Sequence, residues 1–173
     1  MLFRSLRGRV ALLTGGRVKI GYQAGLKLLR AGAHLVVTTR FPRNSATRYA
    51  AEPDFAEWGH RLEIFGLDLR HTPSVEAFCR EMLATRSRLD FIINNACQTV
   101  RRPPEFYAHM MEGERAAMRT LSSEARNLLG SYEDLRQLPA VPDAQMHSAG
   151  LTHAAELSQT PLLAEELLGQ KHL

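Results

Sequence analysis

The sequence predicts an α/β fold built around a parallel β-sheet, on the basis of two observations. Four short apolar runs alternate with stretches of helical spacing over residues 10–97. A turn containing Gly15 and Gly16 separates the first apolar run from the helix that follows it. Because strand and helix alternate, neighbouring strands are expected to run parallel and to be joined by right-handed crossovers.

The four predicted strands are short and have glycine, polar or charged residues at or near their carboxyl ends. The second is rich in β-branched residues, which is typical of a buried strand of a parallel sheet. The predicted strands are the run that begins at Val10, followed by His34–Arg40, Leu62–Leu69 and Leu89–Ala96.

Three helices are expected between these strands. The first covers residues 21–31 and ends at Gly32, because glycine commonly terminates helices. The second begins at Ser45, a good capping residue, and is broken or kinked at Pro53. The third begins at Thr72, where proline follows at the first helical position and apolar residues then repeat at helical spacing.

The chain from Arg101 onward is expected to be mostly helical and exposed, because no further β-branched run occurs there. We therefore predict an N-terminal domain at residues 1–100 and a helical extension or inserted segment at residues 101–173 that is not an independent domain. The fourth strand would present an uncovered apolar edge. We expect either that residues 105–168 pack over this edge or that the protein self-associates.

Composition excludes several classes of protein. The 173 residues are 45% hydrophobic and 23% charged, with a formal net charge of +4. This small excess contains no basic block interleaved with aromatic residues, so we expect no nucleic-acid partner. No apolar run approaches the roughly 20 residues of a membrane span. Cys79 and Cys97 lack metal-ligand spacing and follow no secretory signal, which predicts no metal site and a reducing, cytoplasmic setting.

Polar residues and glycines follow each predicted strand at its carboxyl end. They are the turn Gly15–Gly21, then Arg40, Asp68 and the pair Asn94 and Asn95. In an open parallel sheet, ligands bind beyond the carboxyl ends of the strands, so these residues predict a binding crevice. The glycine turn points main-chain N–H groups and a helix dipole at one spot, which suits a pyrophosphate. Each residue alone also has a plainer interpretation as a turn former, a cap or a surface charge.

Three motifs together resemble the short-chain dehydrogenase/reductase family. Thr14–Gly21 resembles T-G-x-x-x-G-x-G, Asp68-Leu69 resembles D-L, and Asn94–Ala96 resembles the start of N-N-A-G. The resemblance covers residues 8–100. It implies a Rossmann-like three-layer fold with strand order 3-2-1-4, of which residues 1–100 are the N-terminal part, and NAD(P)-dependent oxidoreductase activity.

The resemblance also implies roles for individual residues. The glycine turn would lie at the pyrophosphate, Asp68 and Leu69 along the adenine, and Asn95 and Ala96 at the ribose beside the nicotinamide. Lys19 departs from the family by replacing the middle glycine, so either the turn is reshaped or its ammonium reaches the phosphates. The residues expected to bind the cofactor are Gly15, Arg17, Lys19, Ile20, Gly21, Arg40, Asp68, Leu69, Asn95 and Ala96.

Charge predicts that the cofactor is NADP(H) rather than NAD(H). An acidic residue at the end of the second strand would bind the ribose 2′-OH of NAD and repel a 2′-phosphate. This sequence has Arg40 there, with Arg43 nearby and Arg17 in the glycine turn. A guanidinium binds phosphate and stacks on adenine, and such charge-assisted bonds contribute roughly 1.5–3 kcal/mol each. We expect Arg40 to contribute more than Arg17.

The catalytic residues of the family are not found, so no catalytic residue is predicted. The family uses a tyrosine and a lysine at Y-x-x-x-K, and no tyrosine here has a lysine one turn later. Tyr132 precedes Arg136 at this spacing, which we interpret as coincidence. The chain is therefore expected to stop before the catalytic part.

Three functions remain possible on this basis. The first is an NADP(H)-dependent oxidoreductase acting on an unknown small carbonyl or alcohol, with catalytic residues that this chain does not supply. The second is a catalytically silent dinucleotide-binding module. The third is a protein-interaction module in which the glycine turn is only structural.

Overall fold

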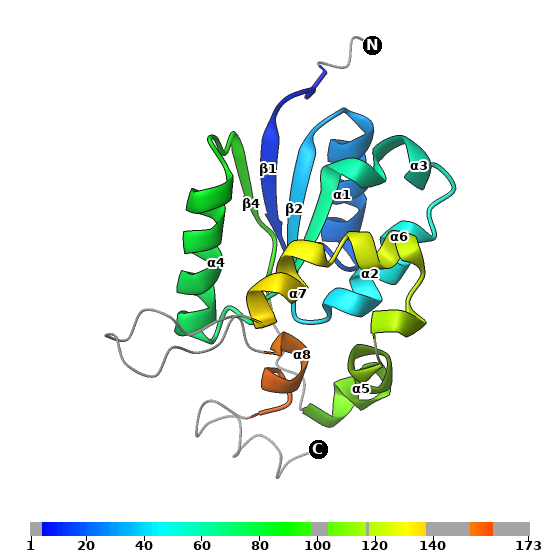
Figure 1. Cartoon of the computed structure of the whole chain (residues 1–173), viewed down its shortest axis with the longest axis vertical. Helices are drawn as coiled ribbons and strands as arrows, with labels where there is room; N and C mark the ends of the chain where they lie inside the picture. Colours follow the sequence, from blue (N-terminus) through cyan, green and yellow to red (C-terminus); the bar gives the residue numbers. More distant parts are fainter. Residues whose placement is uncertain (1–4, 98–103, 117, 138–152, 161–173) are drawn as a thin grey trace.

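The computed structural model describes residues 5–97, 104–116, 118–137 and 153–160. Its centre is a four-stranded parallel sheet in the order β3-β2-β1-β4, with helices packed around it (Figure 1). The Rossmann-like α/β fold and the strand order expected from the sequence are therefore confirmed. The strands are β1 Val10–Thr14, β2 His34–Thr39, β3 Leu62–Gly66 and β4 Phe91–Asn94.

The register of the sheet brings the carboxyl ends of the strands together. Thr14 at the end of β1 lies opposite Thr38 of β2 and Asn94 of β4. Thr39 of β2 lies opposite Gly66 of β3. The four strands therefore end at one edge of the sheet, and the polar residues that follow them in the sequence meet at that edge.

The starts of the first two helices and the capping residue of α4 differ from the prediction. The first helix begins at Lys19 rather than at residue 21. The second helix begins at Pro42 rather than at Ser45, which is buried inside it. Proline suits the first turn because its φ is already helical and it has no N–H to leave unpaired. The residue that caps α4 is His71 rather than Thr72, since the His71 ring accepts from the main-chain N–H of Ser74 at 3.3 Å. The elements are α1 Lys19–Arg30, α2 Pro42–Ala50, α3 Phe55–Trp58, the 3-10 helix η1 Gly59–Arg61 and α4 Thr72–Thr85.

The described part of the C-terminal segment is helical. It comprises η2 Pro104–Tyr107, α5 Ala108–Arg115, η3 Met118–Thr120, α6 Ser123–Asn127, α7 Gly130–Gln137 and α8 Ala154–Leu157. Leu128, Leu129 and Tyr132 belong to the same hydrophobic core as the strands. The division into an N-terminal domain and an extension stays a prediction, and much of residues 138–173 lies outside the described residues.

The helix α7 lies along β3, at the opposite edge of the sheet from β4, and α6 packs against α2 (Figure 1). The main-chain N–H of Ile64 in β3 donates to the carbonyl of Leu128 at 2.8 Å, which satisfies a donor on the outer edge of this strand. Phe91 and Ile92 of β4 remain 40% and 58% exposed. Within the described ranges, the expected packing of the C-terminal segment over β4 is therefore not found, because β3 provides the pairing partner.

No helix among the described residues combines the length and the apolar character needed to cross a membrane. Cys79 and Cys97 are free and exposed. The cytoplasmic setting expected from the sequence stays a prediction.

Candidate functional site

The glycine turn between β1 and α1 is closely packed against the end of β4. Gly15 adopts a left-handed φ of 70°, and its main-chain N–H donates to the carbonyl of Thr38 at 2.8 Å. A Cβ on Gly15 would lie 2.9 Å from Cα of Ala96, and one on Gly21 would overlap the carbonyl oxygen of Gly15 and the amide of Asn95. Both positions therefore require glycine, because no side-chain atom fits there.

Lys19 has a left-handed backbone conformation at the start of α1. Its φ is 53°, which costs a non-glycine residue roughly 1–2 kcal/mol, and its side chain is exposed. Whether the turn is reshaped or the Lys19 ammonium reaches the phosphates stays a prediction. The N-cap residue of α1, Val18, supplies no side-chain acceptor for the first N–H groups of the helix. These donors and the positive end of the helix dipole remain for an anion.

Side chains at the ends of β1 and β4 lock the turn in place. The hydroxyl of Thr14 accepts from the main-chain N–H groups of Asn95 and Ala96 at 3.1 and 3.0 Å. The Asn95 amide donates to the carbonyl oxygens of Gly15 and Thr14 at 3.0 and 3.3 Å. Asn95 thus positions the turn as well as lying at the crevice. Thr14 was missed as a site residue, although it is the threonine of the first motif.

Asp68 is buried and paired with a residue close to it in the sequence. Its carboxylate accepts from the main-chain N–H of Arg70 at 3.0 Å and forms an ion pair with the Arg70 guanidinium at 2.7 Å. This is the turn-forming role that was the plainer interpretation of Asp68. Leu69 is 49% exposed and available for contact. Contact of Asp68 with an adenine stays a prediction.

The Arg17 guanidinium lines a cavity of about 570 Å³ between α2 and residues 106–121, and its hydrogen-bond partners are neutral. It is half-buried and donates to Oδ1 of Asn44 at 3.0 Å and to Sδ of Met110 at 3.3 Å. Burial and the nearby charge of Arg48 lower the pKa of Arg17. No carboxylate of a described residue lies within ion-pair distance of it. Arg17 is therefore a partly desolvated cation with no paired anion in the described part of the chain.

The other two arginines contact the C-terminal segment. Arg40 lies over the ring of Tyr107, with 4.8 Å from Cζ to the ring centroid, and over the ring of Phe41 at 5.7 Å. Arg43 donates to the carbonyl oxygens of Glu114, at 2.9 Å, and of Ala116. Sequence reasoning missed these partners, because nothing in the sequence pairs residues about 70 positions apart.

Tyr132 is a core residue and not a catalytic one. It is 2% exposed and packs with its hydroxyl against Gly66 at the end of β3. Burial raises the pKa of Tyr132 to about 12, and Arg136 lies over its ring at 5.5 Å. The burial of Tyr132 is consistent with interpreting its spacing from Arg136 as coincidence, which stays a prediction.

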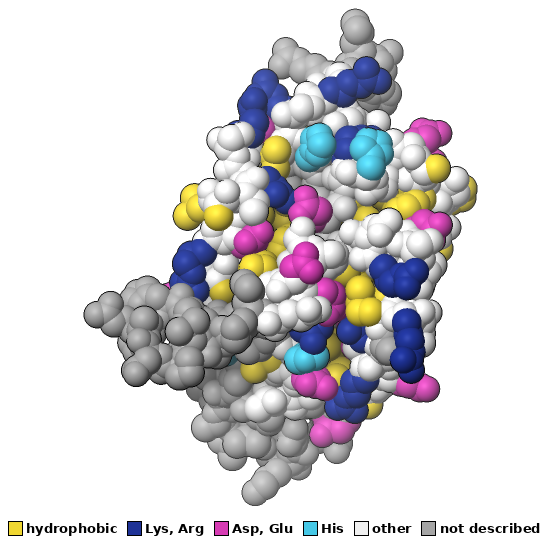
Figure 2. Space-filling model, viewed as in Figure 1, with side chains coloured by type: hydrophobic (Ala, Val, Ile, Leu, Met, Phe, Trp, Pro, Cys, Tyr) yellow, Lys and Arg dark blue, Asp and Glu magenta, His cyan; other side chains and the backbone are white. Residues whose placement is uncertain are grey.

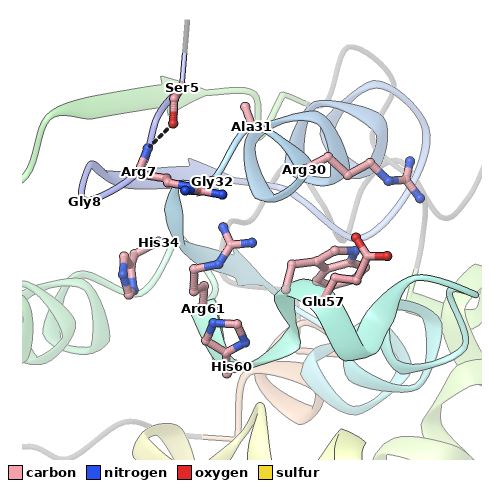
Figure 3. A pocket seen from close by; sticks show the side chains of 11 residues that line it. Ser5, Arg7, Gly8, Arg30, Ala31, Gly32, His34, Glu57, His60 and Arg61 are labelled. Atoms are coloured by element: carbon pink, nitrogen blue, oxygen red, sulfur yellow. Dashed lines mark hydrogen bonds between the residues drawn. The ribbon is translucent and has the colours of Figure 1, made fainter. Parts of the chain in front are cut away.

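A second cleft lies at the opposite end of the strands, where the guanidinium groups of Arg7 and Arg61 approach each other (Figure 3). Its volume is about 800 Å³, and its lining includes arginine and histidine side chains. Figure 2 shows histidines in cyan beside basic side chains in dark blue at this end of the molecule. Arg61 donates to the carbonyls of Leu29 and Ala33 at 2.8 and 2.9 Å. The charge of Arg61 therefore stabilises the C-terminus of α1. This structural role accounts for the arginine in the cleft without a bound anionic ligand. No group of three potential metal ligands occurs among the residues described.

Fold and site together define a Rossmann-type nucleotide-binding domain: a parallel sheet with a tight glycine turn, basic side chains and a helix start at one crevice. A model of the family described as short chain dehydrogenase matches residues 9–124. The chain belongs to the short-chain dehydrogenase/reductase family, whose members are oxidoreductases that bind a nicotinamide dinucleotide.

Several known proteins are similar to this chain. The uncharacterized protein R665 of Acanthamoeba polyphaga mimivirus is 42% identical over 102 residues, which cover 56% of this chain and 22% of that protein. Dehydrogenase/reductase SDR family member 13 of Bos taurus is 38% identical over 105 residues, covering 57% and 27%. The fatty acyl-CoA reductase of Acinetobacter baylyi is 30% identical over 102 residues, covering 58% and 34%. The match thus spans about a fifth to a third of the length of these relatives.

Among solved structures, a gluconate 5-dehydrogenase from Burkholderia cenocepacia in complex with NADP and tartrate is 24% identical. It aligns with a TM-score of 0.47 over 75% of this chain and 49% of that one. A putative short-chain alcohol dehydrogenase from Sinorhizobium meliloti is 22% identical. It aligns with a TM-score of 0.49 over 98% of this chain and 71% of that one.

Proposed function

We propose that this chain binds NADP(H) at the carboxyl ends of its strands, as the nucleotide-holding part of a short-chain dehydrogenase/reductase. The observation that carries the proposal is the environment of Arg17. Its half-buried guanidinium donates to the neutral groups of Asn44 and Met110. Arg48 and Arg40 add positive charge around it, and Glu114 adds negative charge nearby without forming an ion pair with it. A partly desolvated cation without an ion-pair partner gains free energy when an anion binds directly to it. The 2′-phosphate of NADP(H) is such an anion.

Two further features support the proposal. The end of β2 carries Thr38, Thr39 and Arg40, and none of these is the acidic residue that would accept from the ribose 2′-OH of NAD. The start of α1 has no side-chain cap, which leaves its N–H groups for the pyrophosphate.

For the whole protein, we extend the proposal to hydride transfer between the nicotinamide and a carbonyl or alcohol substrate. The cofactor supplies the hydride when it is bound. The residues of this chain would hold and orient it: the glycine turn at the pyrophosphate, and Arg17 and Arg40 at the 2′-phosphate. A catalytically silent binding module is the second candidate function, because Tyr132 lies in the core and forms no acid–base pair with Arg136.

Calorimetric titration with NADPH and NADH tests the proposal. Trp58 fluorescence is a poor reporter, because this residue is buried at the cleft on the opposite end of the strands. We expect NADPH to bind more tightly than NADH. Arg17→Gln should weaken NADPH binding about tenfold or more, because one charge-assisted contact is lost, and should affect NADH much less.

The matched control is Arg80→Gln, which removes an exposed charge from α4 and should leave both affinities unchanged. Equal affinities for NADPH and NADH, unaffected by Arg17→Gln, would contradict the assigned cofactor preference. The absence of binding by either dinucleotide would leave the glycine turn as a structural feature.

Self-association through β4 is a further part of the proposal. The outer edge of this strand is not covered by any described helix, and Phe91 and Ile92 are exposed on it. A second copy pairing at this edge would satisfy main-chain donors and bury these side chains.

A further inference from the structure

The segment of residues 104–116, which comprises η2 and α5, packs against the part of the crevice that follows β2. Its Tyr107 ring lies 4.8 Å from Cζ of Arg40 and 5.3 Å from the Phe41 ring. Its Met110 sulfur accepts from the Arg17 guanidinium at 3.3 Å. Both arginines of the proposed phosphate site are therefore in contact with this segment.

The same segment places a carboxylate at the start of α2. Glu114 is only 8% exposed, and its two oxygens accept from the main-chain N–H groups of Arg43 and Asn44 at 3.1 and 2.8 Å. These are first-turn donors of a nine-residue helix, which would otherwise lack partners. Burial raises the pKa of Glu114, so the ionised carboxylate is held there against a desolvation cost.

An aromatic ring on Arg40 and an anion beside the arginines are the two groups that an adenosine 2′-phosphate would supply. Asn44 joins Glu114 to Arg17. Its main-chain N–H donates to Glu114 at 2.8 Å, and its side-chain oxygen accepts from Arg17 and Arg48 at 3.0 and 3.1 Å. Tyr107 and Glu114 reach this region from a single short segment. The segment therefore supplies an aromatic ring and a negative charge, the same two chemical groups as the adenosine 2′-phosphate end of the cofactor.

We propose that residues 104–116 act as an internal competitor for the adenosine 2′-phosphate end of NADP(H), with Tyr107 in place of the adenine and Glu114 as a negative charge near Arg17 that would repel the phosphate. This inference rests on the proposed function. The cofactor reaches Arg17 and Arg40 only when Tyr107 and Met110 leave them. The observed affinity is then the intrinsic affinity multiplied by the fraction of molecules in which the segment has moved away.

Calorimetric titration with NADPH and NADH tests the competition in the full chain and in two variants. Tyr107→Ala removes the ring, and Glu114→Gln removes the charge while keeping the shape. Glu112→Gln is the matched control, because it changes an exposed carboxylate on the same helix. Competition predicts that Tyr107→Ala tightens binding of both dinucleotides by about threefold to tenfold, as expected for loss of a cation–π contact. Glu114→Gln should tighten NADPH binding more than NADH binding, because only NADPH carries the 2′-phosphate that Glu114 repels.

Amide hydrogen exchange of the unaltered chain gives a second readout that does not depend on a variant folding. Displacement predicts faster exchange over residues 108–115 when NADPH is added. Weaker or unchanged binding in both variants, or slower exchange in α5 on adding NADPH, would overturn the competition while leaving the proposed cofactor site intact. Failure of the chain and of every variant to bind either dinucleotide would overturn the proposed function and the competition with it.

Discussion

Replacing Gly15 with alanine tests whether the tight turn at the end of β1 organises the crevice. Gly15 has a φ of 70°, and its added Cβ would lie 2.9 Å from Cα and 3.2 Å from Cβ of Ala96. The left-handed backbone costs alanine roughly 1–2 kcal/mol, and overpacking against the main chain of Ala96 adds roughly 1–3 kcal/mol. We therefore expect Gly15→Ala to lower the free energy of unfolding by about 2–5 kcal/mol.

The chain contains a control for the backbone part of this effect. Gly8 has a φ of 74°, and a Cβ there would meet nothing within 4 Å. Gly8→Ala should therefore lower the free energy of unfolding by only roughly 1–2 kcal/mol, which is the cost of the left-handed backbone for alanine. The difference between the two variants measures the contact between the turn and the end of β4.

Urea unfolding followed by circular dichroism measures both variants, and calorimetric titration with NADPH measures the site. Gly15→Ala should also weaken NADPH binding, because relief of the contact moves the turn or the Asn95–Ala96 pair. Equal losses of stability in Gly15→Ala and Gly8→Ala would show that the turn is not packed against Ala96, and the geometric basis of the crevice would be refuted.

Three further predictions concern other parts of the structure. The pKa of Asp90 is held well below its usual range by the guanidinium of Arg88, by the N–H of Val10 and by Arg9. The ionised Asp90 therefore stabilises the folded state above about pH 4, and this contribution is lost as pH falls through the lowered pKa. Asp90→Asn should flatten this acid limb in urea titrations from pH 6 to pH 2, and an unchanged limb would place its cause elsewhere. Tyr132→Ala should lower the free energy of unfolding by roughly 3–5 kcal/mol, because removal of a ring that is only 2% exposed leaves a cavity. A loss below about 1 kcal/mol would mean that α7 does not pack on β3. Ile92→Lys should reduce any self-association seen by sedimentation velocity, and an assembly that persists in this variant does not use β4.

Much of the fold could be predicted because its signals are local. The four strands lie within the predicted runs, and Gly15 and Gly21 lie where the chain turns back so closely that a Cβ does not fit. The helix starts were less predictable. Ser45 is a good cap in isolation, yet α2 begins three residues earlier at Pro42 and buries Ser45. Capping preferences are small, and packing against the sheet overrides them.

The partners of the arginines could not be predicted from the sequence. Arg17 and Arg40 were expected at a phosphate, and the structure adds Met110 and Tyr107 as their partners. Nothing near Glu114 in the sequence indicates that it would cap α2. Such contacts join segments that are far apart in the chain, and the polar residues that make them look like ordinary surface positions.

The sequence by itself determined the order of strands and helices, the glycine turn and the family, because each depends on residues that are neighbours in the chain. Only the tertiary structure decided that Asp68 pairs with Arg70, that Tyr132 lies in the core, and that the C-terminal helices lie along β3 and over the basic end of the crevice. The physical reason is that these choices follow from which surfaces remain to be buried once the sheet has formed, and a one-dimensional pattern does not contain that information.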